Sequence, residues 1–376
     1  MTVEILIIGG GINGCAIARE AALNGLSVLL VEKDDLAAHT SSASTKLIHG
    51  GLRYLEYYEF ALVREAIQER ERLLKAAPHL IRPMAFVLPH ENAVRPWWLV
   101  RLGLLLYDTI GGRISLPRSR ALRAGDAAYQ APLKRRSTGF VYWDGACDDA
   151  ALTRAFADDA VANGAEILTD CTLLSARRNG DSWHAQLSSN RTVEARILVN
   201  AAGPWVIDVQ RRLGVNSASD VRLIKGSHIV VPQLYKGDHA YMLQQPDRRV
   251  VFAFPYRGNT AIGTTDVPVV APEDARIDAS EINYLCAAAN RYFSTQIAAA
   301  AVIGSWSGVR PLFDDGAGDA RAVTRDYKLE LDTNGPPLLT VFGGKITTAR
   351  RLGEDALRKL GYRSTATRDR SLESIA

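Results

Sequence analysis

Residues 3–14 read VEILIIGGGING, and this stretch decides the fold. Residues 3–8 are largely apolar and β-branched and predict a short strand. Residues 12–23 place small and apolar side chains at helical spacing and predict a helix that ends at a glycine. The turn between them has the pattern G-x-G-x-x-G, formed by Gly9, Gly11 and Gly14. Such glycines permit a tight turn, close approach of a pyrophosphate, and packing of the helix on the strand.

A second strand, residues 27–31, closes with Glu32 and completes a strand–helix–strand unit, so a parallel sheet is the expected core. The helix N-terminus of such a unit offers free N–H groups to an anion. The Glu32 carboxylate is placed to accept a hydrogen bond from a ribose hydroxyl, and it disfavours a 2′-phosphate. NADP is therefore a poor fit, and NAD and FAD stay open.

The hydroxyl-rich residues 39–46, HTSSASTK, follow where a nicotinamide-binding fold would continue to another crossover helix. Such a loop can contact a second face of a bound dinucleotide. From composition alone, a solvated surface loop is the alternative.

The composition is that of an ordinary globular protein, with 47% hydrophobic and 23% charged residues among 376, a length that suits two domains. The net charge of +4 is small, and no basic tract is interleaved with aromatic residues. We therefore expect no nucleic-acid partner. The basic balance fits an anionic substrate or a weak attraction to acidic lipid.

The four cysteines stand far apart without a C-x-x-C pair, so neither a zinc site nor a disulfide framework is expected. No cluster of His, Cys or Asp has the spacing of metal ligands, and we expect no metal. The chain enters its first strand without the features of a secretory signal. These observations predict a reducing, cytoplasmic location. Residues 304–308, GSWSG, have Trp306 at their centre, so no nucleophile elbow suggests a hydrolase.

Further along, residues 59–76 predict a long charged helix, and residues 83–132 are rich in Pro, Trp and Arg with few periodic strands. We expect the latter segment to enter a second domain. Three strands then return the chain to the first domain, at residues 166–168, 183–187 and 197–200. An antiparallel sheet is predicted from residues 227–231, 249–254 and 261–265. A buried strand, residues 338–342, leads through two glycines into a helix, residues 347–360.

Five segments in order carry a resemblance to a known family. They are residues 40–55 (TSSASTKLIHGGLRYL), 222–228 (RLIKGSH), 262–266 (IGTTD), 307–312 (SGVRPL) and 342–348 (FGGKITT). They closely resemble the motifs of the FAD-dependent, respiratory glycerol-3-phosphate dehydrogenases, and the similarity extends from about residue 3 to residue 360. Five ordered motifs are far more specific than the glycine pattern alone.

The resemblance implies the α/β plus antiparallel-β fold of the D-amino-acid-oxidase group of flavoproteins. We expect a Rossmann-like FAD-binding domain built from residues 1–80, 145–222 and 305–376. An interleaved antiparallel-sheet substrate domain, or cap, would comprise residues 81–144 and 223–304. The family's further C-terminal helical domain is expected to be absent, and the polar tail 362–376 is expected to be frayed.

The activity implied by the resemblance is oxidation of sn-glycerol 3-phosphate to dihydroxyacetone phosphate, by hydride transfer to FAD and onward transfer of electrons to a membrane quinone. It implies a cytoplasmic protein with peripheral contact to the cytoplasmic membrane; a homodimer is compatible with the sequence. Two alternatives stay open. One is a soluble flavin oxidase of the same fold that uses oxygen and another alcohol or an amine. The other is a flavin-binding module without turnover.

The substrate site implied by the motifs is cationic. Arg310 and Arg53 would bind the phosphate, because a guanidinium engages phosphate bidentately. Lys345, after two glycines, would face the substrate oxygen, and Tyr54 and Thr264 would position hydroxyls of the glycerol. For proton transfer we favour His228.

The residues expected to bind FAD lie in the glycine turn, the hydroxyl loop and the later glycine motifs, with His49 contributing to the flavin environment. They are Gly9, Gly11, Asn13, Gly14, Glu32, Thr40, Ser41, Ser42, Ser44, Lys46, His49, Gly50, Gly203, Gly344, Lys345 and Thr347.

Residues 97–107, WWLVRLGLLLY, have two interpretations. Aromatic residues at the start and Arg101 suit a helix that lies on a membrane surface. Periodicity favours the alternative, a buried helix of the cap domain. The run is too short to span a bilayer.

Overall fold

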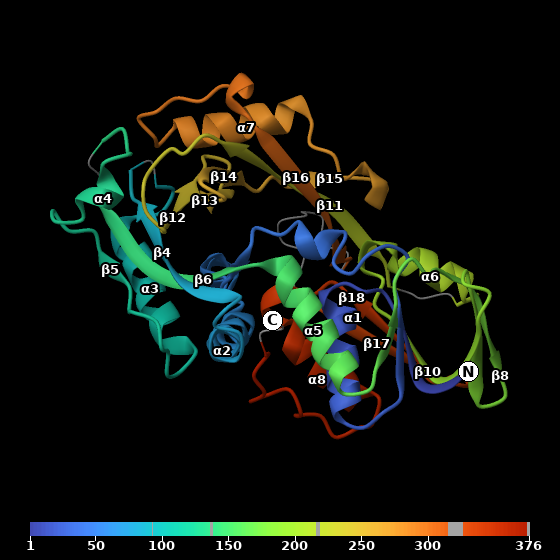
Figure 1. Ribbon diagram of the computed structural model, residues 1–376. Helices are drawn as coiled ribbons and strands as arrows, with labels where there is room; N and C mark the ends of the chain where they lie inside the picture. The colour runs from blue at the N-terminus through green and yellow to red at the C-terminus, as the bar shows by residue number, and fades with distance from the viewer. Residues whose placement is uncertain (92, 136–137, 216–218, 315–325, 374–376) are drawn as a thin grey trace.

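The computed structural model describes residues 1–376 except 92, 136–137, 216–218, 315–325 and 374–376, and it contains two large sheets (Figure 1). The first sheet has the strand order β17-β18-β10-β1-β2-β7, with the β8–β9 hairpin joined to β10. Its strands are β1 (Thr2–Ile8), β2 (Val28–Val31), β7 (Glu166–Leu168), β8 (Leu173–Asn179), β9 (Ser182–Leu187), β10 (Thr192–Asn200), β17 (Lys328–Asp332) and β18 (Leu338–Phe342).

The centre of this sheet is parallel, because β1 pairs in parallel with both β2 and β10, and β10 with β18. One face is covered by α1 (Ile12–Leu23), α5 (Asp149–Ala162) and α8 (Ala349–Lys359), which Figure 1 shows side by side. The other face packs against the β8–β9 hairpin and α6 (Val206–Arg212). The predicted Rossmann-like core is therefore confirmed.

The second sheet has the order β15-β11-β14-β13-β12-β4-β6-β3, with β16 on β11 and β5 on β6. Its strands are β3 (Leu47–Ile48), β4 (Ile81–Pro89), β5 (Arg120–Ala121), β6 (Gly139–Cys147), β11 (Val221–Val231), β12 (Ala240–Gln244), β13 (Val250–Tyr256), β14 (Asn259–Gly263), β15 (Val267–Pro268) and β16 (Gly304–Phe313). It is antiparallel except where β12 meets β4. The predicted antiparallel sheet is confirmed.

Successive side chains of these strands point to opposite faces of the second sheet, so the sheet has one hydrophobic core on each face. Tyr241 packs in a cluster with α7 (Ala279–Asn290), whereas the adjacent Met242 packs in a cluster with α2 (Phe60–Ala76) and α3 (Trp97–Ile110). All strands of the first sheet come from segments that we propose for the FAD-binding domain. The second sheet takes β3, most of β16 and one end each of β6 and β11 from those same segments, so the two proposed domains are interleaved.

The middle of the chain agrees with expectation in one respect and differs in another. The segment 83–132 has few strands, as expected: it holds most of the nine-residue strand β4, which pairs along its whole length with β6, and the short strand β5. The helix at residues 97–107 forms, as α3, but it is not buried: Trp98 is 64% and Leu102 57% exposed. Only Leu104, Tyr107 and Asp108 of α3 are buried. In a helix that is apolar all round, periodicity does not tell which face meets solvent.

The tail is also ordered where it is described, contrary to the expected fraying. The buried Glu20 carboxylate on α1 accepts hydrogen bonds from the backbone N–H groups of Ala366 at 2.9 Å and Thr367 at 3.0 Å, and from the Thr367 hydroxyl. Leu372 is 4% exposed and packs in the core beside α1. Residues 374–376 of the expected tail lie outside the described residues.

Candidate active site

A cavity of about 340 Å³ is lined by both sheets and by the loops that follow their strands. The first sheet contributes the glycine turn after β1, Glu32 after β2, and the 3-10 helix η3 (Gly203–Trp205) after β10. The second sheet contributes Gly226 and His228 on β11 and Arg310 on β16. This cavity lies at the carboxyl ends of parallel strands, where open α/β sheets bind ligands.

The glycine turn has no room for side chains. A Cβ on Gly9 would lie 2.5 Å from the Ala201 carbonyl oxygen, and one on Gly14 would lie 1.9 Å from the Gly9 carbonyl oxygen. Gly9 also has φ +114°, which favours glycine. Helix α1 begins here without a side-chain cap on Gly11 and without acidic residues in its first turn. Its N-terminus therefore fits the pyrophosphate of a dinucleotide.

The hydroxyl loop lies against this helix N-terminus and across to the second sheet. The Ser41 Oγ accepts a hydrogen bond from the Ile12 N–H at 2.9 Å, and the Thr40 hydroxyl donates to the Val309 carbonyl at 2.7 Å. The loop is thus a fixed wall of the cavity, and the solvated-loop alternative does not apply to it.

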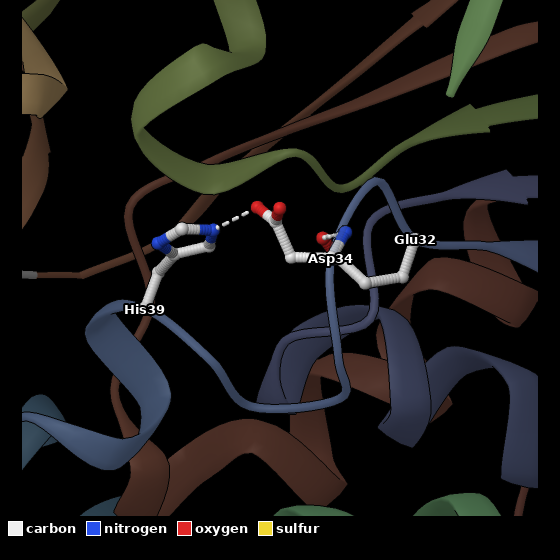
Figure 2. A group of neighbouring side chains, drawn as sticks. All are labelled: Glu32, Asp34 and His39. Atoms are coloured by element: carbon white, nitrogen blue, oxygen red, sulfur yellow. Dashed lines mark hydrogen bonds and ion pairs between the residues drawn. The ribbon is translucent and has the colours of Figure 1, made fainter. Parts of the chain in front are cut away.

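Glu32 is held by backbone amides at the end of β2. Its carboxylate accepts from Gly10 N–H at 2.6 Å and from Asp34 N–H at 3.0 Å, and the residue is 8% exposed. Asp34 in turn contacts the His39 imidazole at 2.6 Å, as Figure 2 shows, and this contact holds the pKa of the Asp34 carboxyl below its usual range.

Glu32, Asp34 and His39 bring potential ligand atoms within 4.8 Å of one another, although their sequence spacing gave no such indication. Each group is accounted for by the contacts above, and exposed acidic groups are common without a metal. Glu32 and His39 line the cavity where the ribose of a dinucleotide would lie, and Asp34 holds the His39 imidazole without lining the cavity itself.

Three buried polar atoms without a hydrogen-bond partner belong to side chains at the cavity. Among the described residues, the buried side-chain atoms without a hydrogen-bond partner are Asn13 Oδ1, His228 Nδ1, Lys345 Nζ and Arg178 Nε. The first three belong to residues that line the cavity. Because buried polar atoms are normally paired, this set fits a polar ligand with both donors and acceptors, as a flavin ring and its substrate are.

The turn at Gly344 places Lys345 at the cavity. Gly344 has φ +101°, and a Cβ there would lie 2.6 Å from the Asn13 amide, which donates to the Gly343 carbonyl at 3.0 Å. The two-glycine turn after β18 therefore packs directly on the start of α1. Lys345 follows it, with its ammonium 4.2 Å from the centroid of the Tyr54 ring.

Arg310 projects from β16 toward the loop that follows β14. Its Nη2 donates to the Thr265 carbonyl at 2.9 Å and to Asp266 Oδ1 at 2.7 Å. A Cβ on Gly226 would lie 2.5 Å from Arg310 Nη2 and 2.6 Å from Thr264 Oγ1. Glycine in the motif RLIKGSH therefore leaves the space in which the Arg310 guanidinium and the Thr264 hydroxyl lie together.

His228 is a fully buried imidazole on β11. Its ring stacks on Trp306 with centroids 4.7 Å apart and planes at 9°, and Nε2 lies 3.2 Å from the Thr45 hydroxyl. Burial, and then the positive charges of Arg310 and Lys46, lower its pKa to about 3. The imidazole is therefore neutral throughout the neutral pH range.

The cavity brings together most of the residues predicted from the sequence. These are Gly9, Gly11, Asn13, Glu32, Thr40, Ser41, Ser44, His49, Tyr54, Gly203, His228, Thr264, Arg310, Gly344, Lys345 and Thr347. Gly14 instead packs on the Gly9 carbonyl, and Ser42 donates to the His39 carbonyl. Gly50 donates its N–H to the Tyr107 hydroxyl.

Two predicted cations lie elsewhere. The Lys46 ammonium forms an ion pair at 2.6 Å with the buried Asp149, and Lys46 lines a second cavity. It therefore supports the hydroxyl loop from the side of that second cavity. The Arg53 guanidinium lies beside Tyr57, with Nη2 3.4 Å from its hydroxyl, and Arg53 does not line the cavity. A phosphate role for Arg53 would require its side chain to turn.

Several lining residues were missed. His39, which was included only as the first residue of the loop 39–46, and Trp205, which follows the predicted Gly203 turn, lie with ring centroids 4.6 Å apart. Lys33 lies 3.8 Å above the Trp205 ring, next to Glu32 in the sequence. Gly226 could have been found, because it stands inside a motif already identified. Cys171 to Leu173 gave no signal, since they come from a distant loop.

The sequence matches the family described as FAD dependent oxidoreductase over residues 4–350. The chain is 53% identical over 371 residues to D-erythritol 1-phosphate dehydrogenase of Brucella abortus, an alignment that covers 96% of this chain and 74% of that protein. It is 52% identical over 367 residues to glycerol-3-phosphate dehydrogenase of Pseudomonas aeruginosa, covering 95% and 71%. Its fold resembles the crystal structure of glycerol-3-phosphate dehydrogenase from Bacillus halodurans complexed with FAD, with a TM-score of 0.75 at 28% identity, covering 97% of this chain and 66% of that one.

Proposed function

This chain belongs to the FAD dependent oxidoreductase family, and on that premise we propose that it is a dehydrogenase that oxidises sn-glycerol 3-phosphate to dihydroxyacetone phosphate. The observation that supports this choice of substrate is the cationic lining of the cavity. Arg310 and the unpaired Lys345 ammonium lie there with the Thr264 and Tyr54 hydroxyls and the imidazoles of His49 and His228. This set matches a small polyol that bears a phosphate.

The cofactor fits the residues at the other end of the same cavity. The glycine turn and the start of α1 would hold the pyrophosphate, Glu32 the ribose, and Asn13 with the Gly343–Gly344 turn the flavin. When bound, FAD supplies a hydride acceptor for oxidation of a secondary alcohol.

Side chains of the second sheet and of the turn after β18 are assigned to substrate binding and to stabilisation of charge. Arg310 binds the phosphate in this proposal, and Thr264 beside it orients a hydroxyl. Lys345 stabilises the negative charge that develops on the substrate oxygen as its proton leaves.

His228 is the proposed proton acceptor. Its burial keeps the ring in the neutral form that can take a proton, although a pKa of about 3 makes it a weak base. Arg310 contributes to that low value, so a phosphate dianion that neutralises Arg310 would raise the pKa when substrate binds. His49 lines the same cavity, so it is the alternative candidate for the proton acceptor.

The decisive experiment is anaerobic titration of the FAD-loaded protein with sn-glycerol 3-phosphate. Bleaching of the flavin near 1:1 stoichiometry supports the proposal, whereas an unchanged flavin spectrum would refute this substrate and leave an enzyme for another substrate or a flavin-binding module without turnover. Comparison of peroxide yield with quinone reduction then separates an oxidase from a dehydrogenase that passes electrons to a quinone, which is our proposed acceptor.

A four-carbon polyol phosphate is the second candidate substrate, because one of the similar proteins is named for D-erythritol 1-phosphate. Both substrates present a terminal phosphate and adjacent hydroxyls, so the lining described above suits either. The ratio of kcat/KM for the two compounds decides between them.

We also propose that the protein contacts the membrane surface through α3 and the neighbouring residues of η2 (Leu52–Tyr57) and α2. No described helix has the length and apolar character that crossing a membrane requires. These elements and Tyr58 carry exposed apolar side chains, which together we call the apolar patch: Tyr57, Tyr58, Phe60, Trp97, Trp98, Leu99, Leu102, Leu105 and Leu106. Exposed Arg113 and Arg118 follow α3 and suit anionic headgroups.

A further inference from the structure

A buried carboxylate on α7, that of Glu281, accepts hydrogen bonds from two side chains and forms an ion pair with a third. Glu281 is 3% exposed and does not line the cavity. Its Oε1 accepts from the Ser227 hydroxyl at 2.8 Å and from the Thr265 hydroxyl at 2.6 Å. Its Oε2 forms an ion pair with the Lys225 ammonium at 2.8 Å. One carboxylate thus joins α7 to β11 and to the loop after β14.

The groups that Glu281 holds are those that set the direction of Arg310. The Thr265 carbonyl accepts from Arg310 Nη2, and the neighbouring Asp266 forms the ion pair with the same nitrogen. The Thr265 hydroxyl also accepts from the Ser227 N–H at 2.9 Å. A shift of Thr265 would therefore move two of the groups against which the guanidinium rests.

The same carboxylate is linked to the strand that carries Arg310. Ser227 faces Ser307 across the β11–β16 pairing, and their hydroxyls lie 2.8 Å apart. Arg310 is three residues further along β16, opposite Ile224. Glu281 consequently fixes both the strand from which Arg310 projects and the loop that it contacts.

Helix capping does not account for this arrangement. Glu281 also accepts from the Asp278 N–H at 3.1 Å, within a capping box at the start of α7. That contact uses Oε2 and would be served equally by an exposed side chain. Burial of an ion pair costs desolvation, and the added hydrogen bonds to Oε1 satisfy the carboxylate but serve no helix end.

We propose that Glu281 is a positioning residue for Arg310, acting through Thr265 and Ser227, with Lys225 as the counter-charge. The inference rests on the proposed function in that Arg310 takes the substrate phosphate. It goes beyond that function by assigning substrate affinity to a helix outside the cavity.

The variants Glu281→Ala and Glu281→Gln test this role. In Glu281→Ala we expect KM for sn-glycerol 3-phosphate to rise about tenfold, with a smaller change in kcat and normal FAD content. Glu281→Gln keeps an oxygen acceptor for the two hydroxyls and should recover part of the affinity. Leu285→Ala is the matched control, because Leu285 is fully buried on the same helix but outside the network. It should lower the thermal midpoint and leave KM unchanged.

A double-mutant cycle with Arg310→Lys separates positioning from general support of the fold. If Glu281 acts through Arg310, the combined variant should lose much less than the product of the two single losses. Independent, multiplicative losses would overturn the proposal, as would a KM for Glu281→Ala equal to that of wild type. Should Glu281→Ala fail to fold, Thr265→Val removes the hydroxyl that reaches Glu281 and serves in the same cycle.

Inorganic phosphate, used as a probe of the flavin spectrum, distinguishes this inference from the proposed function. If wild-type protein is not bleached by sn-glycerol 3-phosphate, the proposed function fails. Weaker phosphate binding by both Glu281→Ala and Arg310→Lys would still support the positioning role. Phosphate binding that only Arg310→Lys weakens would refute it.

Discussion

The ammonium of Lys345 lies 4.2 Å from the centroid of the Tyr54 ring, and no hydrogen-bond partner reaches it. The aromatic ring offers a cation partial compensation, worth about 0.5–2 kcal/mol. A buried ammonium normally requires more than this, so Lys345 is prepared for an anionic or electronegative ligand.

Lys345→Met should therefore lower the rate of flavin reduction by about 10²-fold, the usual effect of removing one donor to a developing oxyanion. Tyr54→Phe keeps the ring and should change the rate much less. Stopped-flow absorbance of the flavin under anaerobic conditions measures both. Equal rates for Lys345→Met and wild type would remove Lys345 from the chemical step.

Purified protein should be yellow and release FAD on denaturation, and Gly11→Val should abolish FAD binding. A Cβ on Gly11 already lies 3.1 Å from Ser41 Oγ, and the larger valine would fill the space of the pyrophosphate. Absorbance of the released flavin gives the FAD content. Gly125→Ala, where the Cβ would meet open space, is a control outside the cavity. Recovery of NAD alone would contradict the cofactor assignment.

Arg310→Ala should lose roughly 2–5 kcal/mol of transition-state binding, as when one partner of a buried charged pair is truncated. Arg310→Lys keeps the charge without the planar fork and should also be clearly impaired. FAD content should stay normal in both variants. The measurement is kcat/KM for sn-glycerol 3-phosphate and for glycerol. An unchanged preference for the phosphorylated compound in Arg310→Ala would show that Arg310 is not the phosphate ligand.

His228 should make the protein less stable in mild acid. Its pKa falls from 6.5 to about 3 on folding, so the unfolded chain binds a proton in this window and the folded chain does not. The free energy of unfolding should fall as pH decreases from 6.5 toward 3, by about 1.4 kcal/mol per pH unit for this group. Urea unfolding between pH 7 and 5 should give a shallower pH dependence for His228→Asn.

His239 contributes in the same direction, because its burial lowers its pKa to about 4. The variant His239→Gln should therefore also reduce the pH dependence of the free energy of unfolding. The reductions from His228→Asn and His239→Gln should be additive. If His228→Asn keeps the full wild-type slope, the imidazole is not buried in its neutral form.

Replacement of Trp98 or Leu102 by Glu should weaken binding to anionic vesicles by at least about tenfold, since burial of such a side chain contributes about 1.5–3 kcal/mol. Activity with a soluble dye should not change. Val270→Glu, at an exposed apolar position outside the patch, is the control. Co-flotation with vesicles measures binding, and equal flotation of all variants would exclude the patch as the membrane contact.

The first strand–helix–strand unit could be predicted because its information is local. The run of residues 3–14 specifies strand, turn and helix, and the structure confirms each of them. The motif glycines were also informative, since Gly9 and Gly344 stand where no other residue fits. The buried Glu281 escaped notice because the residues that it binds come from distant segments.

The exposure of α3 could not be predicted for a different reason. A helix with apolar residues on every side gives no pattern that distinguishes its buried face, and only the packing of α2 and β6 determines that Leu104 and Tyr107 point inward. His39 likewise acquires its place from Asp34 and Trp205, which a single histidine in a sequence does not indicate.

The contacts of α1 with distant segments bear on the order in which the cofactor site can form during synthesis. Helix α1 is translated early, but its buried Glu20 carboxylate takes backbone donors from Ala366 and Thr367. Asn13, on the same helix, donates to the carbonyl of Gly343, which is 330 residues further along the chain. The glycine turn therefore reaches its final surroundings only after Gly343 has been synthesised, and a nascent chain that stops before this residue should bind FAD weakly.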